Sequence, residues 1–240
     1  TIFIGVGVAV SSVFDKDSRK LINCAIDMFE GVMLKDIVEE IFQMPAYIDN
    51  ESNLCALSVQ TTADNYSNIV YLHSSEGVGV GIVAEGNLIR GKNGYGAEVS
   101  HIPVGNPKIK CPTCKGYGCV ENELSVKGIV SQYFNDEDNK NGLDVLKNWE
   151  IFLQSLEKEE IKAMKMVNEI GKTIGVLSTI LINIFDPEVF YIGGNISVLQ
   201  DYIMEPFINE IKTKSPMAYD KKLPIIFDKN SDMTINIGIN

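Results

Sequence analysis

The stretch IKAMKMVNEIGKTIGVLSTILINIFDPEVFYIGGN, residues 161–195, decides the fold class. Apolar side chains recur at helical spacing over residues 159–185, and Pro187 ends the predicted helix. The following VFYIGGN predicts a strand with a glycine turn at Gly193, and a second helix is predicted over residues 198–212. Because strands that alternate with helices indicate a largely parallel sheet, we predict an α/β fold.

The same alternation extends towards both ends of the chain. Strands are predicted in SNIVYLHSS, GVGVGIVAEG and AYIDNES, and regular structure is not expected between residues 91 and 119, where glycine and proline are dense. The chain begins with a predicted strand and edge hairpin and closes with a predicted strand, MTINIGIN. We therefore expect both ends to be cuts through a larger fold. Further helices are predicted over residues 34–42 and 143–157.

Composition excludes several classes of protein. With 240 residues, 45% of them hydrophobic, the chain can bury a sizeable core and is not a disordered segment. Its 32 acidic and 21 basic residues give a net charge of −11, which disfavours nucleic acid and anionic membranes as direct partners. No apolar run approaches the roughly 18 residues of a spanning helix. Five cysteines, three of them close together, indicate a metal site in a reducing cytoplasm rather than a disulfide framework.

The strongest chemical signal is HIPVGNPKIKCPTCKGYGC, residues 101–119. One histidine and three cysteines at this spacing can close a tetrahedral shell, which zinc favours at structural sites. Two other interpretations remain, namely three ordinary cysteines on a loop and a CxxC redox pair. The predicted metal ligands are His101, Cys111, Cys114 and Cys119.

Two carboxylates flank this loop. Glu98 lies three residues before His101, and Glu121 lies two residues after Cys119. If a metal takes one imidazole nitrogen, the other can face a ligand, and the two carboxylates can accept hydrogen bonds from vicinal hydroxyl groups. Spacing alone predicts solvated loop acids equally well.

These residues carry a resemblance to a known family. GNLIRGKNGYGAEVSHIPV and CPTCKGYGCVE, within residues 86–121, resemble the sugar motif Glu-x-Gly-His and the zinc motif of the ROK family of repressors, open reading frames and kinases. SEGVGVGIV, YIDNESNLCAL and VFYIGGNIS resemble other family segments. The resemblance implies an actin-like sugar-kinase (ribonuclease H-like) fold with two lobes around a cleft. Residues 1–48 would form a partial N-terminal lobe, and residues 49–240 a large lobe with the sugar site and an inserted zinc loop, 101–119.

Two departures from the family's kinases concern catalysis. The kinases have Asn-Asp where this chain has Asn50 and Glu51, and that aspartate is the base that deprotonates the sugar. A glutamate base is chemically possible, but its extra methylene displaces the carboxylate, and errors of about 1 Å can cost on the order of 100-fold in rate. The phosphate-binding Gly-Thr-Gly is replaced by residues 75–77, in which Glu76 would repel a triphosphate.

Further departures concern the ligand. The sugar motif has become residues 98–101, with Ser100 where the family has glycine. Ala25 and Ile26 replace a Pro-Asn pair and so remove one hydroxyl partner. The sugar pocket is therefore expected to differ from that of the family's kinases.

The resemblance implies an effector-sensing, non-catalytic domain of a transcriptional regulator of carbohydrate genes, similar to the xylose and N-acetylglucosamine repressor group. Its partners would be a sugar or sugar phosphate, and DNA only through a winged helix upstream of this chain. A homodimer with structural zinc and without ATP is expected. The alternatives are an ATP-dependent sugar kinase with Glu51 as base, and a protein-interaction module that has lost its small ligand. The candidate ligand-binding residues are Asn50, Glu51, Glu98, His101 and Glu121.

Overall fold

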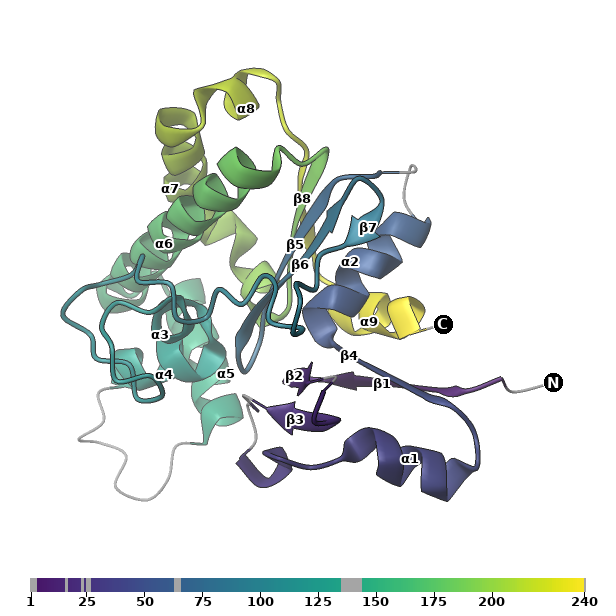
Figure 1. The fold of residues 1–240 in the computed structure, drawn as a ribbon. Helices are drawn as coiled ribbons and strands as arrows, with labels where there is room; N and C mark the ends of the chain where they lie inside the picture. The colour runs from purple at the N-terminus through teal and green to yellow at the C-terminus, as the bar shows by residue number, and fades with distance from the viewer. Residues whose placement is uncertain are drawn as a thin grey trace.

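The computed structural model describes residues 4–15, 17–22, 24, 27–62, 66–134 and 144–239. Its centre is a five-stranded sheet in which the strands β5, β8 and β9 run parallel and the strands β6 and β7 run antiparallel to their neighbours. The order across the sheet is β7-β6-β5-β8-β9 (Figure 1). The strands are β5 (Ile69–Ser74), β6 (Val78–Ala84), β7 (Asn87–Leu88), β8 (Val189–Gly193) and β9 (Ile225–Asp228).

The sheet is mixed, whereas the sequence predicts a largely parallel one. Only residues 75–77 separate β5 from β6, and so short a connection can join antiparallel strands but not parallel ones. Long helical crossovers precede β8 and β9, which is why these two strands follow the direction of β5. The predicted strands at 67–75 and 77–86 and the turn after Ala84 are confirmed.

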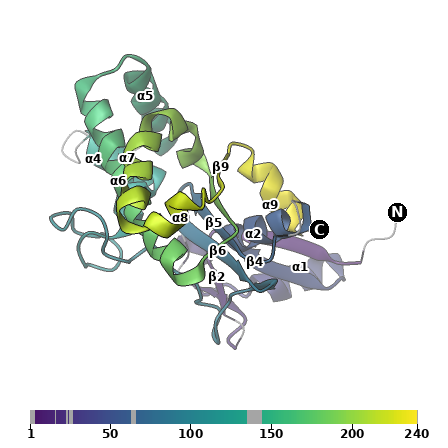
Figure 2. The same cartoon turned by 90° about the horizontal axis from the view of Figure 1, so that it is seen from above.

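Helices cover both faces of the sheet (Figures 1 and 2). On one face, Val70 and Leu72 of β5 pack into a core that includes side chains of α3 to α7. On the other face, Ile69 and Tyr71 pack against α2. No described helix combines the length and apolar character that a membrane crossing requires. The helices are α2 (Glu51–Thr62), α3 (Val120–Leu124), α4 (Val126–Phe134), α5 (Val145–Glu157), α6 (Ile161–Phe185), α7 (Gln200–Lys214), α8 (Pro216–Asp220) and α9 (Ser231–Ile239), and a 3₁₀ turn spans Asn195–Leu199.

Glycines allow α2 to approach the sheet and α9 closely. A Cβ on Gly81 of β6 would overlap the carbonyl oxygen of Ser52, and one on Gly238 of α9 would overlap that of Leu54. This packing explains a wrong prediction, because residues 233–239 of the MTINIGIN segment, expected as a strand, lie in the helix α9. Its alternating apolar residues suit a strand, but the contact with α2 through Gly238 favours the helix.

The first part of the chain forms two small sheets. β1 (Val6–Val10) pairs in parallel with β4 (Ala46–Asn50), and β2 (Val13–Asp15) forms a hairpin with β3 (Lys20–Ile22). A 3₁₀ turn (Asp27–Phe29) and α1 (Leu34–Phe42) connect β3 to β4. The helix α1 confirms the predicted element, although it buries only Val38 of its apolar stripe among the described residues.

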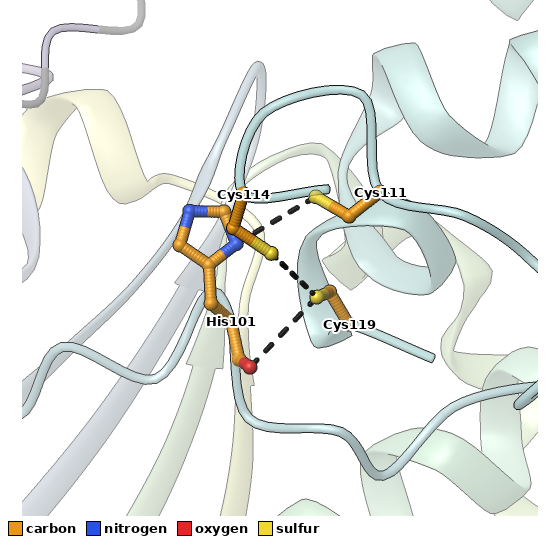
Figure 3. A group of neighbouring side chains, drawn as sticks. All are labelled: His101, Cys111, Cys114 and Cys119. Carbon is orange, nitrogen blue, oxygen red and sulfur yellow. Dashed lines mark hydrogen bonds between the residues drawn. The ribbon is translucent and has the colours of Figure 1, made fainter. Parts of the chain in front are cut away.

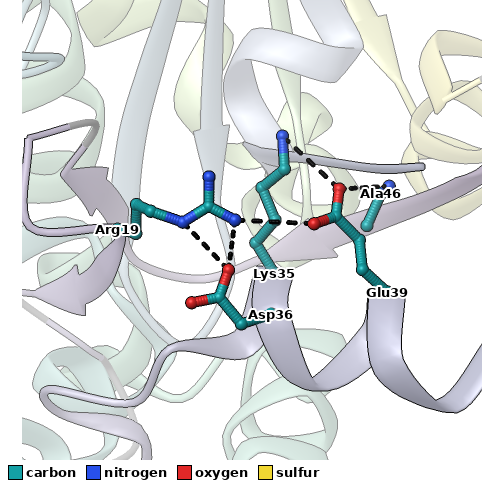
Figure 4. A network of polar contacts seen from close by, with 5 residues as sticks. All are labelled: Arg19, Lys35, Asp36, Glu39 and Ala46. Atoms are coloured by element: carbon teal, nitrogen blue, oxygen red, sulfur yellow. Dashed lines mark hydrogen bonds and ion pairs between the residues drawn. The ribbon is translucent and has the colours of Figure 1, made fainter.

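A polar network joins the hairpin, α1 and the start of β4 (Figure 4). The guanidinium of Arg19 donates to Asp36, with its Nε 2.9 Å from Oδ1, and lies 3.5 Å from Glu39 Oε2. Glu39 Oε1 in turn accepts the backbone N–H of Ala46 at 3.0 Å and lies 3.8 Å from Lys35 Nζ. Exposed ion pairs of this kind contribute at most about 1 kcal/mol each, so their main effect here is to fix where β4 begins.

Candidate functional site

The three cysteines and His101 converge at one point (Figure 3). Their ligand atoms all lie within 4.8 Å of one another, with His101 Nδ1 3.7 Å from Cys111 Sγ and Cys114 Sγ 3.4 Å from Cys119 Sγ. That sulfur separation is far above the roughly 2.05 Å of a disulfide, and all three thiols are free. The donor set, one imidazole and three sulfurs, fits a tetrahedral metal ion of the zinc type. The described residues therefore form a cluster that can hold a metal ion.

The loop backbone places the sulfurs. Cys111 N–H donates to the carbonyl oxygen of Gly116 at 2.8 Å, and Gly118 takes a φ of 68°, which suits glycine. The N–H of Gly116 points at Cys114 Sγ and lowers the pKa of that thiol. Burial raises the pKa of Cys119 to about 12. The loop backbone thus holds the three sulfurs close to His101.

A pocket of about 300 Å³ lies beside the cluster. One side of the pocket is formed by the β2–β3 hairpin, and the other by residues 95–101, which precede the three clustered cysteines. Because His101 belongs to both the pocket and the cysteine cluster, the two features share one side chain. Figure 3 shows that its Nδ1 faces the sulfurs while the other ring nitrogen points away from them. The lining residues are Val13, Ile22, Tyr95, Glu98, Ser100 and His101.

Glu121 adjoins the pocket through a closed ring of three hydrogen bonds. Its Oε2 accepts the N–H of Val78 at 3.1 Å, and its own N–H donates to the carbonyl oxygen of Ser100 at 2.8 Å. The Ser100 hydroxyl closes the ring by donating to the carbonyl oxygen of Val78 at 2.7 Å. Burial raises the pKa of Glu121 to about 7; the negative charge of Glu98 adds to this rise, and the Val78 N–H and Lys127 oppose it.

Asn50 and Glu51 lie outside the residues that line the pocket. Asn50 Oδ1 accepts the N–H of Asn53 at 2.8 Å and so caps the first turn of α2. Glu51 Oε2 accepts a hydrogen bond of 2.7 Å from the Ser11 hydroxyl and lies 3.8 Å from His73 Nε2. The described structure therefore brings Glu98 and His101 together in one pocket, whereas it engages Glu51 elsewhere. Ala25 and Ile26 lie outside the described residues.

Two contacts around Asn50 and Glu51 have no clear signal in the sequence. His73, at the end of β5, is buried beside Glu51. Burial lowers the pKa of His73, and the negative charges of Glu51, Asp232 and Asp228 oppose this shift. Arg90 donates to Asp49, one residue before Asn50. Both contacts join segments that are distant in the chain, so residue spacing does not reveal them.

The turn between β5 and β6 packs directly on the late glycine turn. The Ser75 hydroxyl donates to Asn195 Oδ1, and Gly194 has a φ of 80° at a point where a Cβ would overlap the carbonyl oxygen of Ser74. Glu76 is exposed at the tip of the turn. Glu76 therefore has no packing role in this turn.

Glu123 gives a pH-dependent prediction. It is buried in α3, where its Oε1 accepts the N–H of Asn106 at 3.0 Å, and burial, followed by the charge of Glu169, raises its pKa above the ordinary 4.5. Stability should therefore rise as the pH falls through the raised native pKa towards 4.5, because the native state binds the proton first. Glu123→Gln keeps an acceptor for Asn106, so denaturation should show a more stable protein at pH 7 and the loss of this pH-dependent gain. A variant that is less stable at pH 7 would contradict the assignment, and Glu157→Gln, at an exposed position, is the control.

The ROK family model matches residues 1–232. The xylose repressor of Caldicellulosiruptor bescii is 28% identical over an alignment of 245 positions, which covers 98% of this chain and 61% of the repressor. A glucokinase of Halalkalibacterium halodurans is 30% identical over 218 residues, covering 85% of this chain and 64% of the glucokinase. The chain thus spans less than two thirds of either relative.

Solved structures agree on the fold. A ROK family transcriptional regulator, a homolog of the E. coli MLC protein, superposes with a TM-score of 0.77 and 21% identity over 98% of this chain and 61% of that chain. The overall architecture is therefore shared with solved ROK structures that include sugar kinases, as the resemblance implied. Because the family model spans nearly all of the sequence, we conclude that this chain belongs to the ROK family.

Proposed function

We propose that this chain is the effector-sensing, non-catalytic part of a ROK transcriptional regulator that responds to a sugar. The observation that carries the proposal is the pocket in which Glu98 and His101 meet beside the cysteine cluster. Carboxylate acceptors and an imidazole donor suit vicinal hydroxyl groups, since each hydroxyl both donates and accepts. The similarity to a xylose repressor over 98% of the chain supports a regulator.

The position of Glu51 supports a non-catalytic role. A general base must come within hydrogen-bond reach of the proton that it removes. Glu51 is engaged by Ser11 and lies near His73, and it is not among the residues that line the pocket.

The location of the pocket supports lobe closure as the signal. Val13 and Ile22 come from the proposed N-terminal lobe, residues 1–48, whereas Glu98 and His101 come from the proposed large lobe, residues 49–240. A ligand held by both sides would favour the closed arrangement, and such a rigid-body movement can be transmitted to an attached domain. In this proposal zinc fixes the loop that carries His101, and DNA is contacted by a winged helix outside residues 1–240.

A sugar panel tests the proposal. A monosaccharide at 100 times its dissociation constant should stabilise the metal-loaded protein by about 2.7 kcal/mol, a shift of roughly 5–10 °C for a chain of this size. Differential scanning fluorimetry measures it. Glu98→Gln should reduce the shift, whereas the exposed Glu157→Gln should leave it unchanged. If pentoses, hexoses and N-acetylhexosamines all leave the unfolding temperature unchanged, the protein is not a sugar sensor.

The glucokinase relative, 30% identical, favours a sugar kinase as the second candidate. The substitution Glu51→Asp distinguishes a sensor from a kinase, because it restores the aspartate that the family's kinases have at the base position. A coupled assay of ATP-dependent sugar phosphorylation on the full-length protein should detect no turnover in either form if the chain is a sensor. Turnover in the wild type, or its appearance in Glu51→Asp, would support the kinase instead.

A further inference from the structure

The cysteine cluster contains one thiol that solvent reaches and two that it does not. Cys114 is exposed on the loop, whereas Cys111 is fully buried and Cys119 is only 2% exposed. All three are free thiols. Because a cysteine is oxidised only when the oxidant reaches its sulfur, a small oxidant in solution meets Cys114 before it meets either of the other two.

Cys114 already has a second sulfur in contact. Its Sγ lies 3.4 Å from that of Cys119 (Figure 3), so a disulfide of roughly 2.05 Å requires the two atoms to approach by about 1.4 Å. Two of the four residues between these cysteines are glycines, and Gly118 takes a φ of 68°. Since glycine adopts backbone conformations that other residues avoid, the segment can adjust to so small an approach.

The third cysteine is held in a different contact. Cys111 Sγ lies 3.7 Å from His101 Nδ1, and the backbone N–H of Cys111 donates to the carbonyl oxygen of Gly116 at 2.8 Å. The described contacts therefore pair Cys114 with Cys119, and Cys111 with the imidazole.

From these contacts we infer that Cys114 and Cys119 form a reversible disulfide when hydrogen peroxide reaches the loop, and that this bond displaces the metal ion. The Cys114 sulfur attacks one peroxide oxygen, the O–O bond breaks, and a sulfenic acid and one water form. The Cys119 sulfur then attacks the sulfenic sulfur, the S–O bond breaks, and a second water leaves. The two sulfurs give up two electrons, and the protons of the waters come from the thiols or from solvent.

The disulfide would act on the pocket through neighbours of the cluster. An ion that loses two of four tetrahedral ligands is no longer held, so His101, which also lines the pocket, would lose its anchor. Cys119 is the N-cap of α3, and the N–H of Glu121 in α3 donates to the carbonyl oxygen of Ser100, another lining residue. Redox control of this kind goes beyond the proposed sensing of a sugar.

Hydrogen peroxide added to the metal-loaded, full-length protein tests the inference without any sugar, so the result does not depend on the sensing function. A chromogenic chelator follows zinc release, and differential alkylation with peptide mass spectrometry identifies the oxidised cysteines. We expect zinc release and a disulfide between Cys114 and Cys119 to appear together, while the fully buried Cys55, outside the cluster, stays reduced. Dithiothreitol and added zinc should reverse both changes.

Cys114→Ser removes the exposed thiol and should slow the oxidation of the remaining cluster on the order of tenfold. Cys24→Ser, outside the cluster, should leave the disulfide and the zinc release unchanged. If Cys114→Ser fails to fold or to retain zinc, the disulfide map of the wild type still decides. Zinc that stays bound at peroxide concentrations that oxidise free cysteine overturns the inference. A disulfide between Cys111 and Cys114, or oxidation of Cys114 to a sulfinic acid without a disulfide, does the same.

Discussion

Cys111→Ser is expected to release the metal from the loop and to lower the unfolding temperature by about 5–15 °C. A metal ion present at 100 to 1,000 times its dissociation constant contributes about 2.7–4.1 kcal/mol to stability, and each kcal/mol shifts a chain of this size by roughly 2–4 °C. Cys111 is fully buried, and its sulfur lies 3.7 Å from His101 Nδ1. A serine oxygen is a poorer ligand for zinc than a thiolate. Elemental analysis and calorimetry measure the two effects.

Cys24→Ser is the matched control, because Cys24 is a free thiol that is not part of the cluster. It should retain the metal content and the unfolding temperature of the wild type. The response to sugar should also weaken in Cys111→Ser, since the loop that holds His101 loses its anchor. Metal content that stays undiminished in Cys111→Ser, or a sugar response that survives metal loss unchanged, would contradict the proposed coupling.

Gly81→Ala is expected to destabilise the fold by about 3 kcal/mol or more, which corresponds to roughly 6–12 °C. The added methyl group would overlap the backbone carbonyl of Ser52, and a backbone atom cannot rotate away as a side chain can. Either α2 or β6 must therefore move. Denaturant unfolding, followed by circular dichroism, measures the change in the free energy of unfolding.

Gly77→Ala is the matched control, directly before the same strand, β6. A methyl group added at Gly77 would have Glu121 Oε1 as its nearest neighbour, 3.6 Å away, which is an ordinary van der Waals contact. The loss should stay below about 1 kcal/mol. Equal effects at the two positions would show that α2 can adjust its distance from the sheet at little cost.

The central strands and helices are largely predictable from the sequence, because their patterns are local. The helix α6 follows from the apolar stripe of residues 159–185, and β5 from a short apolar run. The helix α2 escapes prediction because nearly its whole circumference is buried, including Ser52, Asn53 and Ser58, so it has no polar face to set a period. In α9, the alternation of apolar residues predicts a strand, whereas the packing of this segment against α2 favours a helix.

The candidate site is likewise only partly predictable from the sequence. The metal cluster is predictable because its four ligands lie within 19 residues and follow a spacing set by coordination chemistry. The pocket is not, because Val13 and Ile22 reach Glu98 and Ser100 only through the tertiary fold. The partners of Glu51, Ser11 and His73, are hidden for the same reason.

The shared side chain His101 limits how this protein can be changed. A substitution there alters the metal cluster and the pocket together, so it cannot retune the choice of ligand without disturbing the scaffold. Glu98 and Ser100, on the same pocket wall, are not part of the metal cluster and are open to exchange. Any redesign of the pocket for another ligand should therefore keep His101 unchanged and vary the residues beside it.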